Sequence, residues 1–111
     1  MTKIGEGKTP APEPTVKTYQ KALEESAGKF ENALQSYQVA DDTDQRMALK
    51  SIMDQQLALI RSAVQEIKRG GMYKEEVLVE SDYQKFVNNP SPENIAALEH
   101  DLQTLRDYNK L

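Results

Sequence analysis

Hydrophobic side chains recur along this chain at helical spacing, in four segments separated by short polar stretches. In residues 16–39 they return every three, four or seven positions, which places them on one face of a helix because 3.6 residues make one turn. They are Val16, Tyr19, Leu23, Phe30, Ala33, Leu34 and Tyr37. Pro14 and Thr15 precede the segment and Asp41 follows it, so we predict a helix over 16–39.

The second segment, residues 44–69, is hydrophobic over the widest arc. Its hydrophobic residues are Leu49, Ile52, Met53, Leu57, Leu59, Ile60, Ala63, Val64 and Ile67. A helix with so wide an arc needs more than one neighbour to cover it, so we expect it at the centre of the core. Either Asp42 or Thr43 can cap its start, and Gly70-Gly71 can supply the left-handed residue that stops it.

The third segment, residues 73–88, is less regular. Residues 77–79 are contiguous, hydrophobic and partly β-branched, which leaves a short strand open. No second segment offers a pairing partner, and Tyr83 and Phe86 continue at helical spacing. We predict a helix over 73–88, with a break near Ser81-Asp82 as the alternative.

The fourth segment begins with the strongest local signal. Pro90 disfavours helix at the residue before it, Ser91 is a good N-cap, and Pro92 suits the first helical position. A seam follows at 3-4-3 spacing, made by Ile95, Leu98, Leu102 and Leu105. We predict a helix over 92–108, and the short connection makes it an antiparallel neighbour of the third helix.

These segments predict an all-α fold, an antiparallel bundle of about four helices with a C-terminal helical hairpin. The alternative is a pair of long hairpins completed only by a second copy or a partner. Residues 1–15 hold three of the five prolines and two of the five glycines, which predicts a disordered tail before a single domain over 16–111. A solvated linker and an export or recognition segment share this tail composition.

Composition narrows the class of protein. The 111 residues contain 14 Lys and Arg against 18 Asp and Glu, and this net charge of -4 argues against nucleic-acid binding. The absence of cysteine excludes disulfides and thiolate sites. No hydrophobic run approaches the roughly 20 residues of a membrane span, and the polar first residues lack the hydrophobic region that would predict a Sec-type signal. We expect a cytoplasmic protein, or one exported by a route other than Sec, without membrane insertion.

Candidate catalytic and metal-binding side chains are few. His100, the only histidine, falls opposite the hydrophobic seam of its helix, as a surface histidine does. The carboxylates of Asp41, Asp42 and Asp44 lack the central glycine and closing glutamate of a calcium loop. Glu75-Glu76 is predicted on an outer face. We therefore predict no catalytic residue, no metal and no cofactor, and hence a protein that is not an enzyme.

Binding of a protein partner is the better expectation. The wide face of 44–69 and the seam of 92–108 carry more hydrophobic surface than two neighbouring helices readily cover. Self-association or capture of a helix from another protein would cover it. The tyrosines on the seams are assigned to the core, with partner contact as the alternative. The predicted partner-binding residues are Leu59, Leu98, Leu102, Leu105 and Tyr108.

The stretch from Tyr83 to Lys110 reads YQKFVNNPSPENIAALEHDLQTLRDYNK. Its Asn89–Pro92 turn and the leucine seam that runs to Tyr108 resemble the helix-turn-helix of type III secretion needle subunits, over about a quarter of the chain. Those subunits are small, cysteine-free helical hairpins that polymerise outside the cell. They have no counterpart of the helical pair over 16–69, so a small helical chaperone or accessory component fits equally.

The resemblance implies a structural or chaperone-like component of a bacterial type III secretion system. The alternative is a cytoplasmic helical adaptor or regulator that binds a partner helix and is unrelated to secretion.

Overall fold

Four helices account for most of the chain in the computed structural model, which describes residues 15–111. In order they are α1 (Val16–Val39), α2 (Thr43–Ile67), α3 (Met72–Asn88) and α4 (Pro92–Lys110). The described residues contain no strand, and α3 continues unbroken through Ser81-Asp82. The predicted all-α bundle of four helices is confirmed, while the strand and the break are not.

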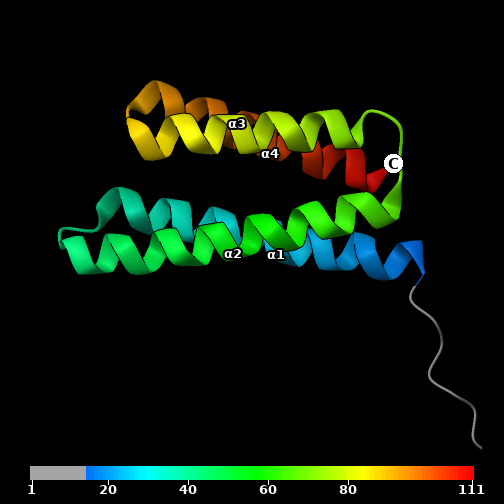
Figure 1. The fold of residues 1–111 in the computed structure, drawn as a ribbon, viewed down its shortest axis with the longest axis horizontal. Helices are drawn as coiled ribbons and strands as arrows, with labels where there is room; N and C mark the ends of the chain where they lie inside the picture. The colour runs from blue at the N-terminus through cyan, green and yellow to red at the C-terminus, as the bar shows by residue number, and fades with distance from the viewer. Residues whose placement is uncertain (1–14) are drawn as a thin grey trace, which may run out of the picture.

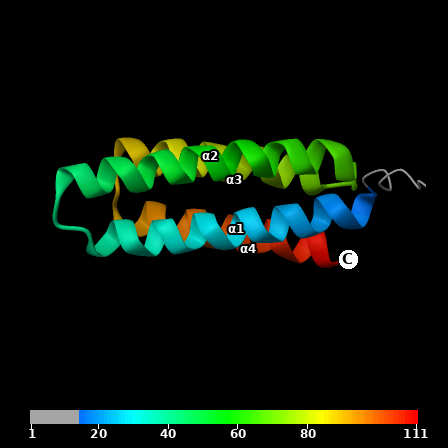
Figure 2. The ribbon, with the colours of Figure 1, turned by 90° about the horizontal axis from the view of Figure 1, so that it is seen from below.

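The helices form two antiparallel hairpins, α1–α2 and α3–α4, which lie one above the other (Figure 1). The view turned by 90° shows α2 beside α3 and α1 beside α4 (Figure 2). Each helix thus packs against two others, and in the described part of the chain the diagonal pairs α1/α3 and α2/α4 make no close backbone contact. The helix α2 is therefore one corner of a square and not its centre, which corrects that expectation.

Side-chain caps begin three of the helices, as their sequences predicted. Thr15 forms a capping box with Thr18 at the start of α1, and the Asp42 carboxylate accepts from the backbone N–H of Gln45 at 3.3 Å. The Ser91 hydroxyl accepts from the N–H of Asn94 at 3.2 Å, with Pro92 in the first helical position. Thr15 belongs to the bundle, and the rest of the predicted tail lies outside the described residues.

The connection between α2 and α3 differs from the prediction. The helix α2 ends at Ile67, and the left-handed residue that stops it is Lys68, with φ 57°. Gly71, with φ 83°, is the other left-handed residue of the connection and immediately precedes α3. The left-handed stop at Gly70-Gly71 was thus misplaced, because Lys68 already adopts the conformation that glycine takes most easily.

The core lies between the two hairpins and is built from all four helices. It includes Phe30, Met53, Ile60, Tyr83, Phe86 and Leu102, each at most 2% exposed. Phe30 and Tyr83 meet edge to face with ring centroids 5.6 Å apart, and Tyr37 and Phe86 do so at 5.1 Å. These aromatic contacts join α1 to α3 side chains across the middle of the bundle.

The first hairpin is longer than the second. The helices α1 and α2 have 24 and 25 residues, whereas α3 and α4 have 17 and 19. The end of the bundle at the α1–α2 connection therefore projects beyond the α3–α4 turn (Figure 1). Val39 and Met47 lie near this end and are 78% and 63% exposed.

Candidate functional site

The predicted partner-binding leucines of α4 lie in the core. Leu98, Leu102 and Leu105 are each 0% exposed. The helix α4 packs between α1 and α3, and these two neighbours cover the three leucines, while Ile95 of the same seam is partly exposed. The three leucines therefore contact helices of the same chain. This finding corrects the expectation that the seam stays open for a partner.

Tyr108 connects the end of α4 to the connection between α2 and α3. Its ring is half-buried and lies so close to Gly71 that a Cβ there would be 3.1 Å from the tyrosine hydroxyl. The Arg69 guanidinium donates a hydrogen bond to the backbone carbonyl of Tyr108. This arrangement gives Tyr108 a structural role and leaves Leu59, 50% exposed, as the one residue of the predicted set on the open surface.

Leu59 lies on a groove between α1 and α2, on the face turned away from α3 and α4. Three adjoining hollows of about 360, 300 and 480 Å³ make up this groove, and neighbouring hollows share Lys29, Ser36 or Leu49. We call it the outer groove. Its floor and rims include Ala22, Glu25, Ser26, Lys29, Ala33 and Ser36 from α1 and Leu49, Ile52, Gln56, Leu59 and Ala63 from α2.

Small residues spaced by two helical turns create the floor of the outer groove. Ser26 and Ala33 are seven apart on α1 and are buried against α2, so the two helices approach closely there. Ile52 and Leu59, also seven apart, stand on the rim of α2 at 41% and 50% exposed. The groove is thus a hydrophobic seam at coiled-coil spacing, and no helix among residues 15–111 covers its outer side.

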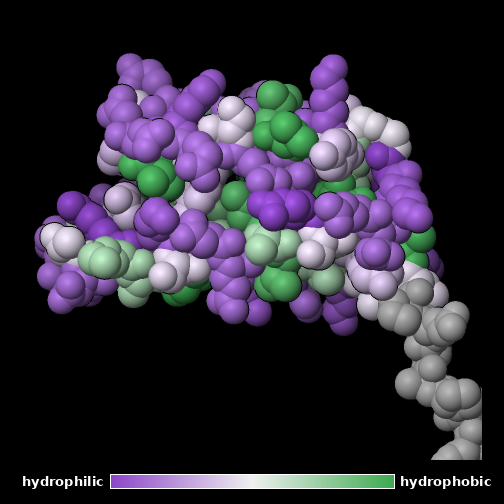
Figure 3. Space-filling view, in the orientation of Figure 1, coloured by the Kyte–Doolittle hydropathy of each residue, from purple (hydrophilic) through white to green (hydrophobic). Residues whose placement is uncertain are grey.

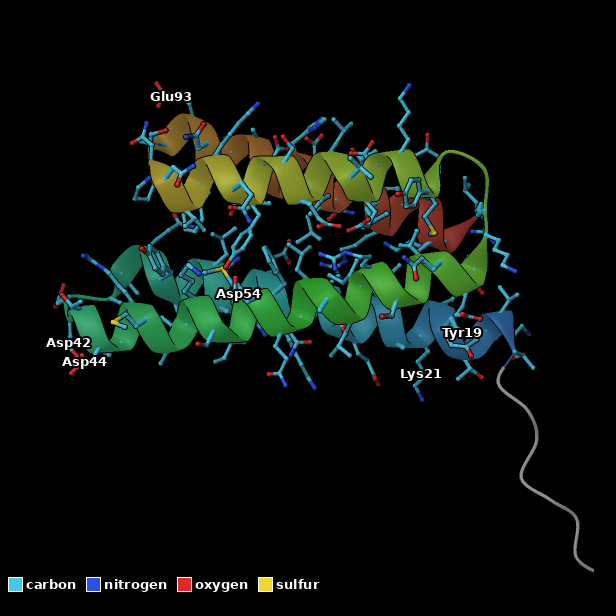
Figure 4. All side chains as sticks on the ribbon, in the orientation of Figure 1. Tyr19, Lys21, Asp42, Asp44, Asp54 and Glu93 are labelled. Carbon is cyan, nitrogen blue, oxygen red and sulfur yellow. The ribbon has the colours of Figure 1, made fainter. Side chains whose placement is uncertain are left out.

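The figures show where this surface lies. Figure 2 looks onto the α1–α2 face. In Figure 4 Lys21 points away from the second hairpin, whereas Asp54 points toward it. The space-filling view shows hydrophobic residues along the lower edge beneath α2 and a hydrophobic patch over α3, with mostly hydrophilic and some hydrophobic residues between them (Figure 3).

A second feature is a buried acidic side chain, Glu76, beside a partly exposed one, Glu80. Glu76 is 1% exposed, although the sequence placed it on an outer face. It shares the inner face of α3 with Val79 and Tyr83, three and seven residues on. Glu80 lies beside it and accepts from Arg61 of α2 at 2.6 and 2.9 Å. Burial, together with Glu80, raises the pKa of Glu76 to about 8.

The other buried carboxyl group, Asp82, faces α4. It is 8% exposed, and burial together with a hydrogen bond shared with Asp101 raises its pKa to about 6. Burial and Asp101 also raise the pKa of Glu75. Asp101 lies 3.4 Å from the Nδ1 of His100. Below about pH 6 the Asp82 carboxyl keeps a proton and can donate a hydrogen bond to the Asp101 carboxylate, which removes the like-charge repulsion between α3 and α4 at that contact.

Polar contacts also join the two hairpins. Arg106 of α4 bonds to Glu24 of α1 and reaches Glu31 at 3.0 Å. The Tyr83 hydroxyl of α3 donates to the Asp54 carboxylate of α2. These contacts stabilise the pairing of α1 with α4 and of α2 with α3. Each charged side chain named here therefore has a partner within the chain.

The remaining candidates from the sequence have ordinary positions. The His100 side chain is 81% exposed, as predicted. Asp42 caps α2. Within residues 15–111 no group of three histidine, aspartate or glutamate side chains is arranged to hold a metal ion. None of the helices in the same range is long and hydrophobic enough to cross a membrane.

Comparison with known proteins adds no relative: no protein-family model, no curated protein and no solved structure matches this chain.

Proposed function

We propose that this chain is a non-enzymatic protein–protein interaction module whose outer groove receives a helix. One observation carries the proposal. Ile52 and Leu59 stand half-exposed on one rim, over a floor in which Ser26, Ala33 and Ala63 are almost completely buried. An incoming helix would insert its side chains at i, i+3, i+4 and i+7 over such a floor.

The charge of the groove supports the same conclusion. Among the described residues that line the three hollows, only Glu25 and Lys29 are charged, whereas 29% of the residues in the sequence are charged. Depletion of charge with retention of hydrophobic side chains is typical of the central part of protein interfaces. A ligand in the groove is therefore a protein helix and not a nucleic acid or an ionic small molecule.

The α3–α4 hairpin supports a narrower form of this proposal, a structural or chaperone-like component of a bacterial type III secretion system. The hairpin contains the Asn89–Pro92 turn and the leucine seam on which the resemblance to needle subunits rests. In this form the protein acts in the cytoplasm or leaves by a non-Sec route. The alternative is a cytoplasmic adaptor that uses the same groove for a helix of an unrelated protein.

Purification of the tagged protein from its native host tests the proposal. We expect a partner that is retained by the wild-type chain and lost with Leu59→Lys. The matched control is Leu78→Lys on α3, because Leu78 is 44% exposed but lies on the other hairpin. Secretion components among the retained proteins would support the narrower form, and other cytoplasmic proteins would support the adaptor. Retention that Leu59→Lys leaves unchanged would contradict the groove as the binding site.

A further inference from the structure

We propose that the occupant of the outer groove is a second copy of this chain, related by a two-fold axis that crosses α1 and α2 at right angles. This inference rests on the proposed use of the groove and names its partner. It is carried by the placement of two complementary pairs, Glu25 with Lys29 and Ile52 with Leu59, at the same level of the hairpin.

The level of each pair follows from the antiparallel course of α1 and α2. Asp41 lies in the connection between them, so residues equally far from it in sequence lie at the same height along the hairpin. Glu25 and Lys29 are centred on Ala27, which is 14 residues before Asp41. Ile52 and Leu59 are centred beside Gln55, which is 14 residues after it. Both pairs are therefore centred on one level.

A two-fold axis at this level makes both pairs complementary to themselves. It lays α1 over α1 of the second copy and α2 over its α2, with each pair antiparallel. Glu25 then meets Lys29 of the second copy, and the reverse contact forms on the other side of the axis. In the same way Ile52 meets Leu59 of the second copy twice. The two copies together form a four-helix layer with a hydrophobic centre.

The other two-fold arrangement is less favourable. An axis parallel to the helices lays α1 over α2 of the second copy without changing heights. Lys29 would then lie over Ile52, and Glu25 would lie close to Leu59. Burying charges against hydrophobic side chains without a partner costs free energy, so the crossing axis is the one that the side chains favour.

The face is large enough for a stable dimer. The 25 residues of α2 span about 37 Å at a rise of about 1.5 Å per residue, and two adjacent helices are roughly 20 Å wide. A face of about 700 Å² per copy is close to the roughly 800 Å² that each partner buries in a standard interface.

Sedimentation equilibrium over a hundredfold concentration range tests the dimer. We expect a dimer for the wild-type chain and at least about tenfold weaker association for Leu59→Lys. Leu78→Lys, with similar exposure on α3, should associate like the wild type. Circular dichroism confirms that both variants fold. A wild-type chain that is monomeric throughout, or a dimer weakened by Leu78→Lys and not by Leu59→Lys, would overturn the proposal.

A charge-exchange experiment tests the contact across the axis. Glu25→Lys and Lys29→Glu each place two like-charge contacts in a homodimer, so each alone should weaken association by about tenfold. An equimolar mixture of the two variants restores an opposite charge at every contact, and it should associate at least as tightly as the wild type. A mixture no tighter than either variant alone would contradict the crossing axis.

A single cysteine tests the same axis by crosslinking, because the chain has no native cysteine. Gln55→Cys places the two thiols next to the axis, and we expect a disulfide-linked dimer within minutes of mild oxidation. Ser81→Cys, exposed on α3, should stay mostly unlinked. Equal crosslinking of the two variants would refute the arrangement.

The outcomes separate this inference from the proposed function. A monomeric chain that retains a host protein through Leu59 refutes the second copy as occupant and leaves the interaction module in place. A monomeric chain whose captured proteins do not depend on Leu59 refutes both.

Discussion

At the scale of single residues, the buried carboxyl groups of α3 are the most informative. Glu76 is 1% exposed and lies beside Glu80, whose carboxylate also binds Arg61. With its pKa raised to about 8, Glu76 carries a proton at neutral pH and can donate a hydrogen bond to the neighbouring Glu80 carboxylate. Burial and Asp101 raise the pKa of Asp82 only to about 6, so Asp82 keeps its proton in mild acid and loses it near neutral pH. The free energy of unfolding of the bundle therefore depends on whether Glu76 and Asp82 are protonated.

This arrangement predicts that the bundle is more stable in mild acid than in mild base. Glu76 titrates near its ordinary pKa of about 4.3 in the unfolded chain and at about 8 in the folded one. Between these values the folded state holds a proton that the unfolded state has lost, so the free energy of unfolding falls as the pH rises. We expect a lower melting temperature at pH 8.5 than at pH 5.5.

The matched variants are Glu76→Gln and Glu93→Gln. Glu76→Gln keeps a hydrogen-bond donor in the interior without a titrating group, so much of this pH dependence should disappear. Glu93 is exposed in the first turn of α4 (Figure 4), and its replacement should leave the dependence unchanged. A melting temperature that rises from pH 5.5 to pH 8.5 in the wild-type chain would show that Glu76 does not hold its proton.

A second prediction at this scale compares Ile60 with His100. Ile60 is 0% exposed between α2 and its neighbours, so Ile60→Asp buries an unpaired charge and should unfold the domain or cost about 3–5 kcal/mol. The His100 side chain is 81% exposed, and His100→Ala should change stability by less than about 0.5 kcal/mol. Urea denaturation measures the free energy of unfolding of both variants. A larger decrease for His100→Ala than for Ile60→Asp would mean that the His100 side of α4 faces the core.

At the scale of the elements, the connection between α2 and α3 is the least relaxed part of the backbone. Lys68 takes a left-handed conformation that costs a residue with a side chain about 1–2 kcal/mol. Gly71 is also left-handed, and Tyr108 packs where its side chain would be. Two neighbouring glycines thus have different roles, since Gly70 has neither a positive φ nor a close neighbour.

Three substitutions in this connection should therefore have different effects. Lys68→Gly should stabilise the bundle by about 0.5–1 kcal/mol, because glycine adopts the left-handed conformation freely. Gly71→Ala should destabilise it by about 1–2 kcal/mol through backbone strain and contact with Tyr108. Gly70→Ala is the control and should stay near neutral. Thermal unfolding measures all three, and equal effects of the two alanine variants would contradict this description of the connection.

At the scale of the whole molecule, the two hairpins differ in length and in how fully they are covered. The projecting end of α1–α2 has no second hairpin above it (Figure 1). The middle of α2 packs against both α1 and α3. Local stability follows such differences in buried contact.

We therefore expect uneven amide hydrogen exchange along the first hairpin. Amides of residues 38–47 should exchange at least about tenfold faster than those of residues 53–64, because the projecting end can open without disrupting the core. Mass spectrometry of peptides after timed exchange measures this difference. The exchange is measured at a concentration at which the chain is monomeric, and uniform protection along α1 and α2 there would contradict this prediction.

The sequence was sufficient for the helices because the signals that define them are local. Thr15, Asp42 and Ser91 begin helices as caps, and the hydrophobic spacing repeats with the helical period. The Asn89–Pro92 turn is short, which leaves an antiparallel hairpin as the only relaxed connection between its two helices. Four helices and the C-terminal hairpin therefore follow from interactions within a few residues.

What covers each helix face was decided only by the tertiary structure. The α4 seam contains Leu98, Leu102 and Leu105, and its spacing alone is compatible with either core or interface. These leucines belong to the core because α1 packs against α4 and covers them. Leu59 has the same hydrophobic character and stays half-exposed because no helix of the described chain lies over it. Glu76 looked like a surface residue by its chemistry, yet its position on α3 turns it inward. Hydrophobic periodicity is a property of one helix. Burial depends on which other helices pack against it, and those helices are distant in the sequence.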